Sequence, residues 1–89
     1  MALGLIRDAF RKGVRLFNHR NSRGCADVYY KTMETIVQMQ NVPSEVQERL
    51  QEAMKEADIM TAQSKRAWTL RYGLDDAREK IFMMQDQHN

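Results

Sequence analysis

The chain has 89 residues, which suffices for one domain of three or four helices spanning residues 1–89. Its 43% apolar content argues against disorder, its lone cysteine excludes an intrachain disulfide, and its apolar runs are too short for a transmembrane helix. The net charge of +2 is uneven, because residues 1–24 hold six basic side chains against one acidic (+5) and residues 25–89 hold eight against eleven (−3). We therefore expect a folded protein of the cytoplasm or another reducing, soluble compartment, basic at its first helix.

An apolar stripe at intervals of three and four residues predicts an amphipathic first helix over residues 2–18. The stripe consists of Leu3, Ile6, Phe10, Val14 and Phe17. Gly13 weakens this helix by about 1 kcal/mol relative to alanine and would let a neighbouring helix approach closely. A polar turn follows, in which Asn21 or Ser22 is expected to cap the second helix.

Apolar residues from Cys25 to Met39 predict the second helix, over residues 24–40. Pro43 cannot continue a helix and separates this one from the next. Ser44, with Gln47 three residues later, has the spacing of a capping box and predicts that a new helix begins there.

A heptad-like seam then extends from Val46 to Arg71 and predicts one long third helix over about residues 44–72. The seam consists of Val46, Leu50, Ala53, Ala57, Met60, Ser64, Ala67 and Arg71. Gly73 is expected to end this helix in a left-handed conformation, and Asp76 to cap a shorter fourth helix. The predicted fold class is all-α: an up-and-down antiparallel bundle of three to four helices, with the third as its spine.

The sequence predicts a non-enzymatic protein without a metal site or a cofactor. It lacks HxxxH, CxxC and DxDxDG spacings as well as a glycine-rich phosphate loop. The one candidate for a reactive thiol is Cys25, which follows Arg23 in the first turn of the second helix, where the helix dipole and the cation would lower a thiol pKa. The alternative interpretation is that Cys25 is a small buried hydrophobic residue.

Basic side chains on the first helix are candidates for binding an anionic partner. Arg7, Arg11 and Arg15 repeat every four residues beside Lys12, a pattern that suits an anionic membrane surface or nucleic acid. The alternative is a solvated face that keeps an amphipathic helix soluble.

Trp68, Tyr72, Tyr30 and Met60 are candidates for a partner-binding groove, because a long third helix has more apolar surface than the rest of the chain can cover. The alternative is that these side chains belong to the core. We expect a small interaction module that docks a helix of a partner protein or self-associates as a homodimer. Binding of an anionic membrane or nucleic acid is the alternative function, and no small-molecule substrate is evident.

Residues 14–40 resemble the helical hairpins of tetratricopeptide (TPR) repeats and the first hairpin of microtubule-interacting-and-trafficking (MIT) domains. In those families an aromatic residue closes the first helix, and a small residue and a tyrosine about four positions apart open the second. Phe17, Ala26 and Tyr30 take these places here, while Arg20-Asn21 stands where the families have Gly-Asp or Gly-Asn. The resemblance implies antiparallel helices with an exposed groove.

Overall fold

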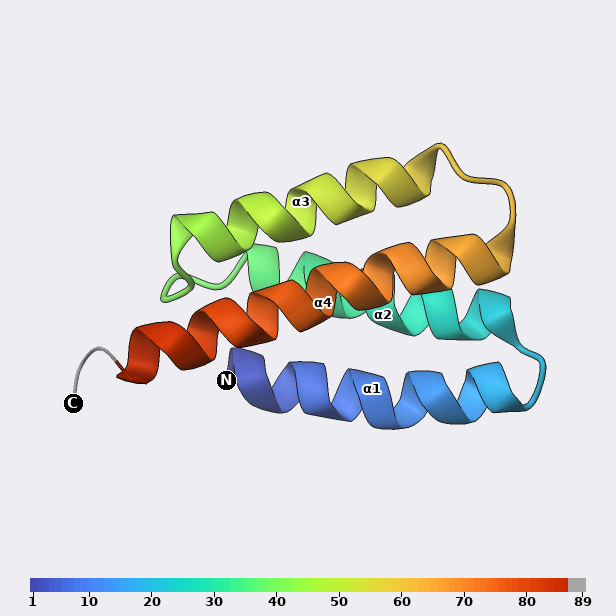
Figure 1. The fold of residues 1–89 in the computed structure, drawn as a ribbon, viewed down its shortest axis with the longest axis horizontal. Coiled ribbons are helices and arrows are strands. Elements are labelled where there is room, and N and C mark those ends of the chain that lie inside the picture. Colours follow the sequence, from blue (N-terminus) through green and yellow to red (C-terminus); the bar gives the residue numbers. More distant parts are fainter. Residues whose placement is uncertain (87–89) are drawn as a thin grey trace.

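The chain folds into four helices that alternate in direction (Figure 1), in a computed structural model that describes the backbone of residues 1–86 and the side chains of residues 1–84. They are α1 (Ala2–Asn18), α2 (Ser22–Val37), α3 (Ser44–Asp58) and α4 (Gln63–Asp86). The predicted all-α antiparallel bundle is confirmed. None of these helices is both long and apolar enough to cross a bilayer.

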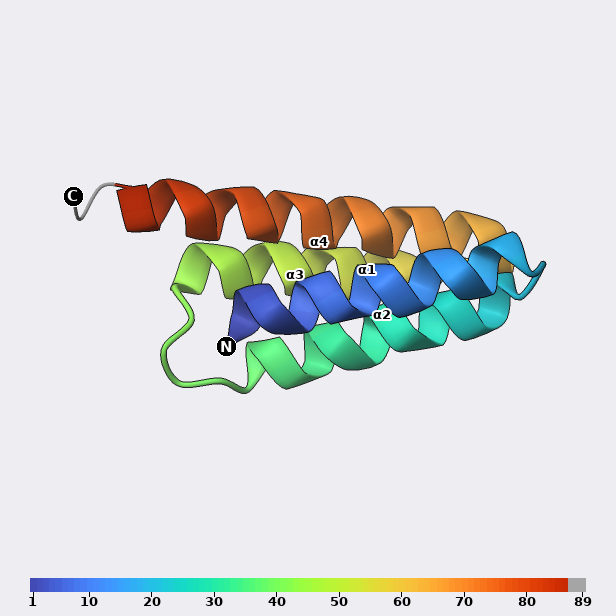
Figure 2. The same ribbon diagram turned by 90° about the horizontal axis from the view of Figure 1, so that it is seen from below.

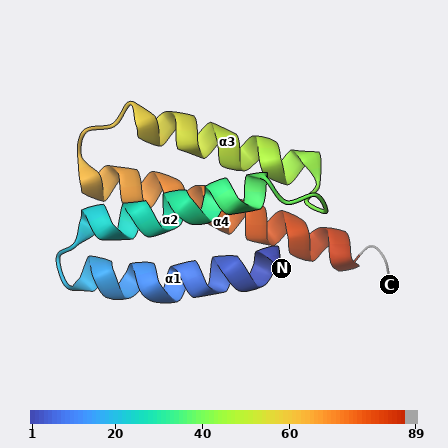
Figure 3. The ribbon, with the colours of Figure 1, turned by 180° about the vertical axis from the view of Figure 1, so that it is seen from behind.

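The helices α2 and α4 pack against each other along the middle of the bundle, while α1 and α3 lie at its two outer corners (Figure 3). Seen from below, α4 and α2 lie on either side of α1 and α3 (Figure 2). This arrangement gives an elongated, flattened body with principal dimensions of 42 × 24 × 17 Å. The core consists of apolar side chains from all four helices, the largest fully buried ones being Ile6, Met33, Ile36, Leu50, Leu70, Leu74 and Val46. The edge between α1 and α4 is packed less extensively than the α3–α4 interface.

The first hairpin follows the sequence closely. The bounds of α1 match the predicted 2–18, and Asn21 caps α2 by accepting a 2.8 Å hydrogen bond from the backbone N–H of Gly24. A Cβ atom at Gly13 would collide with the Tyr29 ring, so this glycine does let α2 approach α1 closely. The bounds of α1 and the Asn21 cap are set locally, by the apolar stripe and the turn residues, whereas the role of Gly13 depends on its contact with α2.

The end of α2 differs from the prediction. This helix ends at Val37 rather than at residue 40, and α3 is preceded by Pro43 without a side-chain cap, so the predicted capping box is wrong. Gln47 instead reaches across and donates from Nε2 to the carbonyl oxygen of Val37, at 3.0 Å. Its amide thereby satisfies one of the carbonyl groups that the last turn of α2 leaves unpaired.

The predicted long third helix over residues 44–72 is wrong. The helix α3 ends at Asp58, residues 59–62 reverse the chain, and α4 returns alongside α3. Side chains of α4 hold this reversal, since Arg66 donates from Nε to the carbonyl oxygen of Ala57 at 3.1 Å and the Thr69 hydroxyl donates to the Met60 sulfur at 3.4 Å. Folding back lets two shorter helices bury their apolar stripes against each other, which a single long helix could not do.

Gly73 does not end a helix, because α4 continues through it without a positive φ. A Cβ atom at this position would lie 2.6 Å from the Cβ of Ala53 and 3.1 Å from the Cε of Met33. The glycine therefore serves close packing among three helices. Asp76 is likewise no cap: its Oδ2 accepts a 2.8 Å hydrogen bond from Nε of Arg49, which ties α3 to α4.

Candidate protein-docking groove

A groove of about 210 Å³ lies between α1 and α4, with α2 forming its floor. It is lined by Val14, Phe17, Asn18, Cys25, Tyr29, Ala67, Trp68 and Arg71. Most of this lining is apolar, so the groove suits an apolar side chain from outside the chain.

Trp68 forms the rim of the groove on α4. Its ring lies 6.0 Å from that of Phe17 in an edge-to-face arrangement and 5.8 Å from that of Tyr72 in a tilted one. These contacts fix the indole in place, yet Trp68 remains 50% exposed and Tyr72 58% exposed. Both lie on the outward side of α4, because Ala67, Leu70 and Leu74 occupy the side that faces the core.

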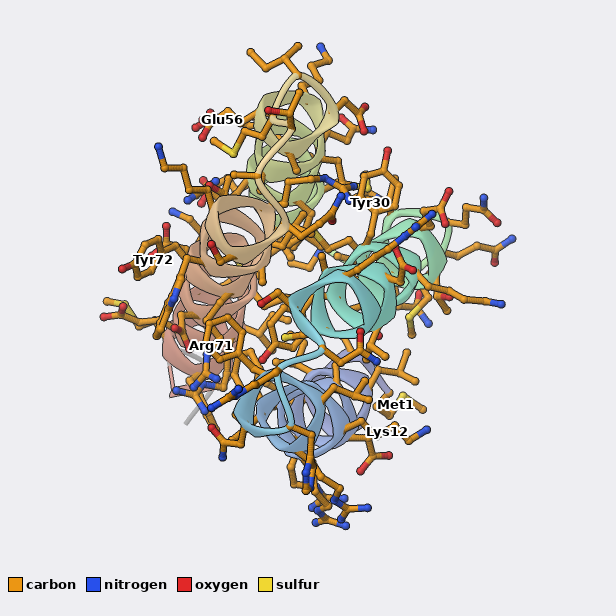
Figure 4. The ribbon with its side chains drawn as sticks, turned by 90° about the vertical axis from the view of Figure 1, so that its right-hand side faces the viewer. Met1, Lys12, Tyr30, Glu56, Arg71 and Tyr72 are labelled. Carbon is orange, nitrogen blue, oxygen red and sulfur yellow. The ribbon has the colours of Figure 1, made fainter. Side chains whose placement is uncertain are left out.

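Arg71 supplies the polar end of the groove. Its guanidinium carbon stands 3.8 Å from the centre of the Phe10 ring, and its Nε donates to Oδ2 of Asp75 at 3.4 Å. Figure 4 shows Arg71 on the side of α4 that turns towards α1, whereas Tyr72 points away from the bundle. The cation–π contact with Phe10 holds a positive charge at a part of the site that is only partly open to solvent.

Cys25 and Tyr29 form the floor and are almost fully buried. Burial raises the pKa of the Cys25 thiol, an effect that the Tyr29 hydroxyl and the Arg71 charge only partly offset. Burial also raises the pKa of Tyr29. Both groups are therefore protonated at neutral pH, and the geometry favours the interpretation of Cys25 as a buried hydrophobic residue over that of a reactive thiol.

The predicted groove candidates are not brought together as one surface. Trp68 and Tyr72 adjoin, but Tyr30 lies across the bundle between α2 and α3 (Figure 4), where a hydrogen bond with Asp58 is the main cause of its raised pKa. Met60 lies in the reversal between α3 and α4 and accepts a hydrogen bond from the Thr69 hydroxyl of α4. Neither lines the groove.

The predicted basic residues of α1 do not all lie on the same side of the helix. Arg7, Arg11 and Arg15 are exposed along α1, whereas Lys12 lies on the opposite side of this helix from Arg71 (Figure 4). Sequence reasoning missed the role of Arg71, which it assigned to the apolar seam. The available signal was the position of Arg71 between Trp68 and Tyr72, two aromatic residues that lie off the seam.

A second hollow, of about 150 Å³, lies among the described residues at the end of the bundle opposite the groove. It is lined by Met1, Ala2, Leu3, Met39, Asn41, Val42, Pro43 and Ile81. None of its lining side chains is charged and none is aromatic, so it offers less for recognition than the groove does.

Within the described part of the chain, no three His, Cys, Asp or Glu side chains gather closely enough to hold a metal ion. Comparison of the chain with protein-family models, with curated proteins and with solved structures gives no match. The resemblance of residues 14–40 to TPR and MIT hairpins stays a prediction.

Proposed function

We propose that this protein is a non-enzymatic interaction module that receives a segment of a partner protein in the groove between α1 and α4. The observation that carries the proposal is Trp68, a half-exposed indole held in place beside an apolar groove. Tryptophan, tyrosine and arginine are the residues that most often dominate binding energy at protein interfaces, and Trp68, Tyr72 and Arg71 provide all three.

The size of the groove supports a side chain of a protein as its occupant. Its volume of about 210 Å³ is below the roughly 300–1,000 Å³ typical of small-molecule sites. One or two apolar side chains of a docked helix would fill it, while the rest of the helix lies along α1 and α4. Because Phe17 and Tyr72 already fix the Trp68 ring, docking would cost little side-chain entropy.

Site-specific photocrosslinking tests this proposal. A photoreactive phenylalanine analogue is placed at Val14, which is 42% exposed and lines the groove, and at Lys12 on the other side of the same helix as a control. In cells of the source organism we expect a discrete crosslinked protein from position 14 and none from position 12. Excess unlabelled protein should suppress the crosslink, whereas its Trp68→Ala variant should not.

Equal crosslinking from both positions, or equal competition by Trp68→Ala, would count against the groove. Light scattering during size-exclusion chromatography, over a tenfold concentration range, identifies whether the partner is a second copy. If the chain forms a dimer that Trp68→Ala dissociates, self-association through the groove is the function.

A second candidate function is peripheral binding of an anionic membrane or nucleic acid through α1. It is favoured by the exposure of Arg7, Arg11 and Arg15, which repeat every four residues along one helix. Vesicles with about one-third anionic lipid, and single-stranded RNA, are the probes. Binding that falls steeply with salt and is lost in a triple Arg→Gln variant would support this function, and no binding at low salt would remove it.

A further inference from the structure

Two stripes of side chains line the edge between α1 and α4. Val14 and Asn18 face the groove, and Arg7 and Arg11 share their face of α1 because they precede Val14 by seven and three residues. On α4, Trp68 and Arg71 face the groove, and Asp75 and Arg78 continue the same stripe at intervals of four and three.

The antiparallel course of the two helices divides this edge into an apolar part and a basic part. Phe10 fixes the alignment, since the guanidinium carbons of Arg71 and Arg78 lie 3.8 and 5.3 Å from the centre of its ring. The groove beside Trp68 is therefore followed along the edge by a region that we call the basic trough, defined by Arg7, Arg11, Arg71, Asp75 and Arg78.

The basic trough has an excess of positive charge. Asp75 is shared, with Oδ2 at 3.4 Å from Nε of Arg71 and Oδ1 at 3.6 Å from Nη2 of Arg78. Among residues 1–84 it is the one carboxylate within 4.0 Å of either guanidinium. Asp8, 3.9 Å from Arg7, and Glu79, four residues after Asp75 on α4, are further acids along these two helix faces, so four arginines against three carboxylates leave a charge of +1.

We propose that the occupant of the groove is an acidic amphipathic helix, which places an apolar side chain beside Trp68 and carboxylates over the basic trough. This inference rests on the proposed docking function and names the chemistry of its partner. Arginine pairs well with carboxylates, because its planar fork can donate two parallel hydrogen bonds. Complementary charge along the edge would steer the helix and fix its direction.

The lining of the groove favours a protein helix over nucleic acid. A nucleobase could hydrogen-bond to Asn18 and Arg71 of the lining. Its other ring nitrogens and carbonyl groups would still lie against Val14, Phe17 and Ala67, which offer them no hydrogen bond. An aliphatic or aromatic hydrocarbon side chain has no hydrogen bond to lose in that position. The charges of the basic trough then favour those amphipathic helices that carry acidic residues beside their apolar face.

Selection from a displayed peptide library tests the inference. The library encodes amphipathic helices of about 16 residues, roughly four turns, with a Leu/Ile/Phe face and polar positions drawn equally from Glu, Gln and Lys. The bait is the full chain, and a parallel selection uses its Trp68→Ala variant. We expect enriched peptides to be rich in Glu on one flank of the apolar face and to disappear with the variant bait.

The possible outcomes separate the two proposals. Enrichment that needs Trp68 but shows no excess of Glu, or an excess of Lys, overturns the acidic partner and leaves docking intact. No enrichment over the Trp68→Ala bait overturns the docking function itself. Displacement of the enriched peptides by single-stranded RNA at equal charge concentration overturns the choice of a protein helix.

A matched pair of variants locates the charge effect. Trp68 is the only tryptophan, so its fluorescence reports occupancy when the peptides lack tryptophan. We expect Arg11→Gln to raise the Kd of an enriched peptide about fivefold at low salt, and Lys12→Gln, which removes the same charge from the other side of α1, to change it less than twofold. If the two variants raised the Kd equally, the effect would come from the net charge of the protein. The proposed role of the basic trough in binding carboxylates would then be overturned.

Discussion

The helix α4 packs against α3 on one side and borders α1 on another, and the two interfaces differ in side-chain size. Towards α3 it presents Gly73, whose missing Cβ would lie 2.6 Å from the Cβ of Ala53. Towards α1 it presents Trp68 and Arg71, which meet the rings of Phe17 and Phe10. Small residues let two helices close on each other, whereas large planar groups keep two helices apart and leave the groove between them.

The polar contacts of the two interfaces also differ: one joins α3 to α4, whereas those on the α1 side stay within α4. Arg49 is 22% exposed in its side chain and donates to Asp76 at 2.8 Å across the α3–α4 interface. Arg71 and Arg78 share Asp75 within α4 at 3.4 and 3.6 Å, with no such link to α1 among residues 1–84. The α3 side is therefore built for stability, and the α1 side retains charge that a partner can use.

The largest expected effect comes from filling the α3–α4 interface. Gly73→Val should lower the free energy of unfolding by about 3 kcal/mol, because its side chain has no room beside Ala53 and Met33. Urea denaturation followed by circular dichroism measures this change. Gly4→Ala is the control: a Cβ there meets nothing within 4 Å, so alanine should raise stability by up to about 1 kcal/mol. If Gly73→Val were as stable as the parent chain, the close approach of α3 and α4 would be refuted.

The next effect comes from removing the charge that links these helices. Asp76→Asn should cost about 1–2 kcal/mol, since Arg49 is mostly buried and its Nη1 already lacks a hydrogen-bond partner among the described residues. Half-exposure of the Asp76 carboxylate keeps the cost below that of a fully buried pair. Urea midpoints of the two proteins give the difference, and a change below about 0.5 kcal/mol would mean that the link contributes little.

The sequence predicts the first hairpin better than the second because the signals there are local. The stripe over residues 2–18 needs only helical spacing, and Asn21 caps α2 through its immediate neighbours. The seam over residues 44–72, in contrast, has the same spacing whether it forms one helix or two antiparallel ones. The reversal at residues 59–62 contains no glycine or proline, and it is held by contacts such as that of Arg66 with Ala57.

The role of a residue cannot be predicted from the sequence when it depends on contact with a residue far away in the chain. Gly73 has the sequence context of a helix end, yet its position is decided by Ala53, twenty residues earlier in the chain. Trp68 and Tyr72 could be identified as flanking the stripe, because that follows from spacing alone. The assignment of Val14 to the core could not be corrected from the sequence, since its 42% exposure depends on how far α4 stands from α1.

A smaller effect is expected on the groove side at alkaline pH. Burial raises the pKa of Cys25 above its ordinary value of 9.0 and that of Tyr29 above 10.0. The native state then keeps protons that the unfolded chain releases, so stability is complete below pH 9 and falls as the pH rises further. Cys25→Ala should make this fall shallower, by at most about 1.4 kcal/mol per pH unit. Urea denaturation at pH 8, 9 and 10 measures the slope, and an unchanged slope in the variant would show that the thiol ionises equally in both states.

The smallest effect on stability and the sharpest contrast between the two interfaces come from Asp75→Asn. Its ion pairs with Arg71 and Arg78 join partly exposed side chains at 3.4 and 3.6 Å, so their loss should change the free energy of unfolding by no more than about 0.5 kcal/mol. The same change removes a carboxylate that competes with the partner's own, and we expect acidic amphipathic peptides to bind several-fold more tightly, as measured by Trp68 fluorescence. Asp76→Asn should do the reverse, lowering stability without changing binding. If instead Asp75→Asn weakened binding, Asp75 would be positioning the two arginines for the partner, and the free charge of the basic trough would not be what attracts it.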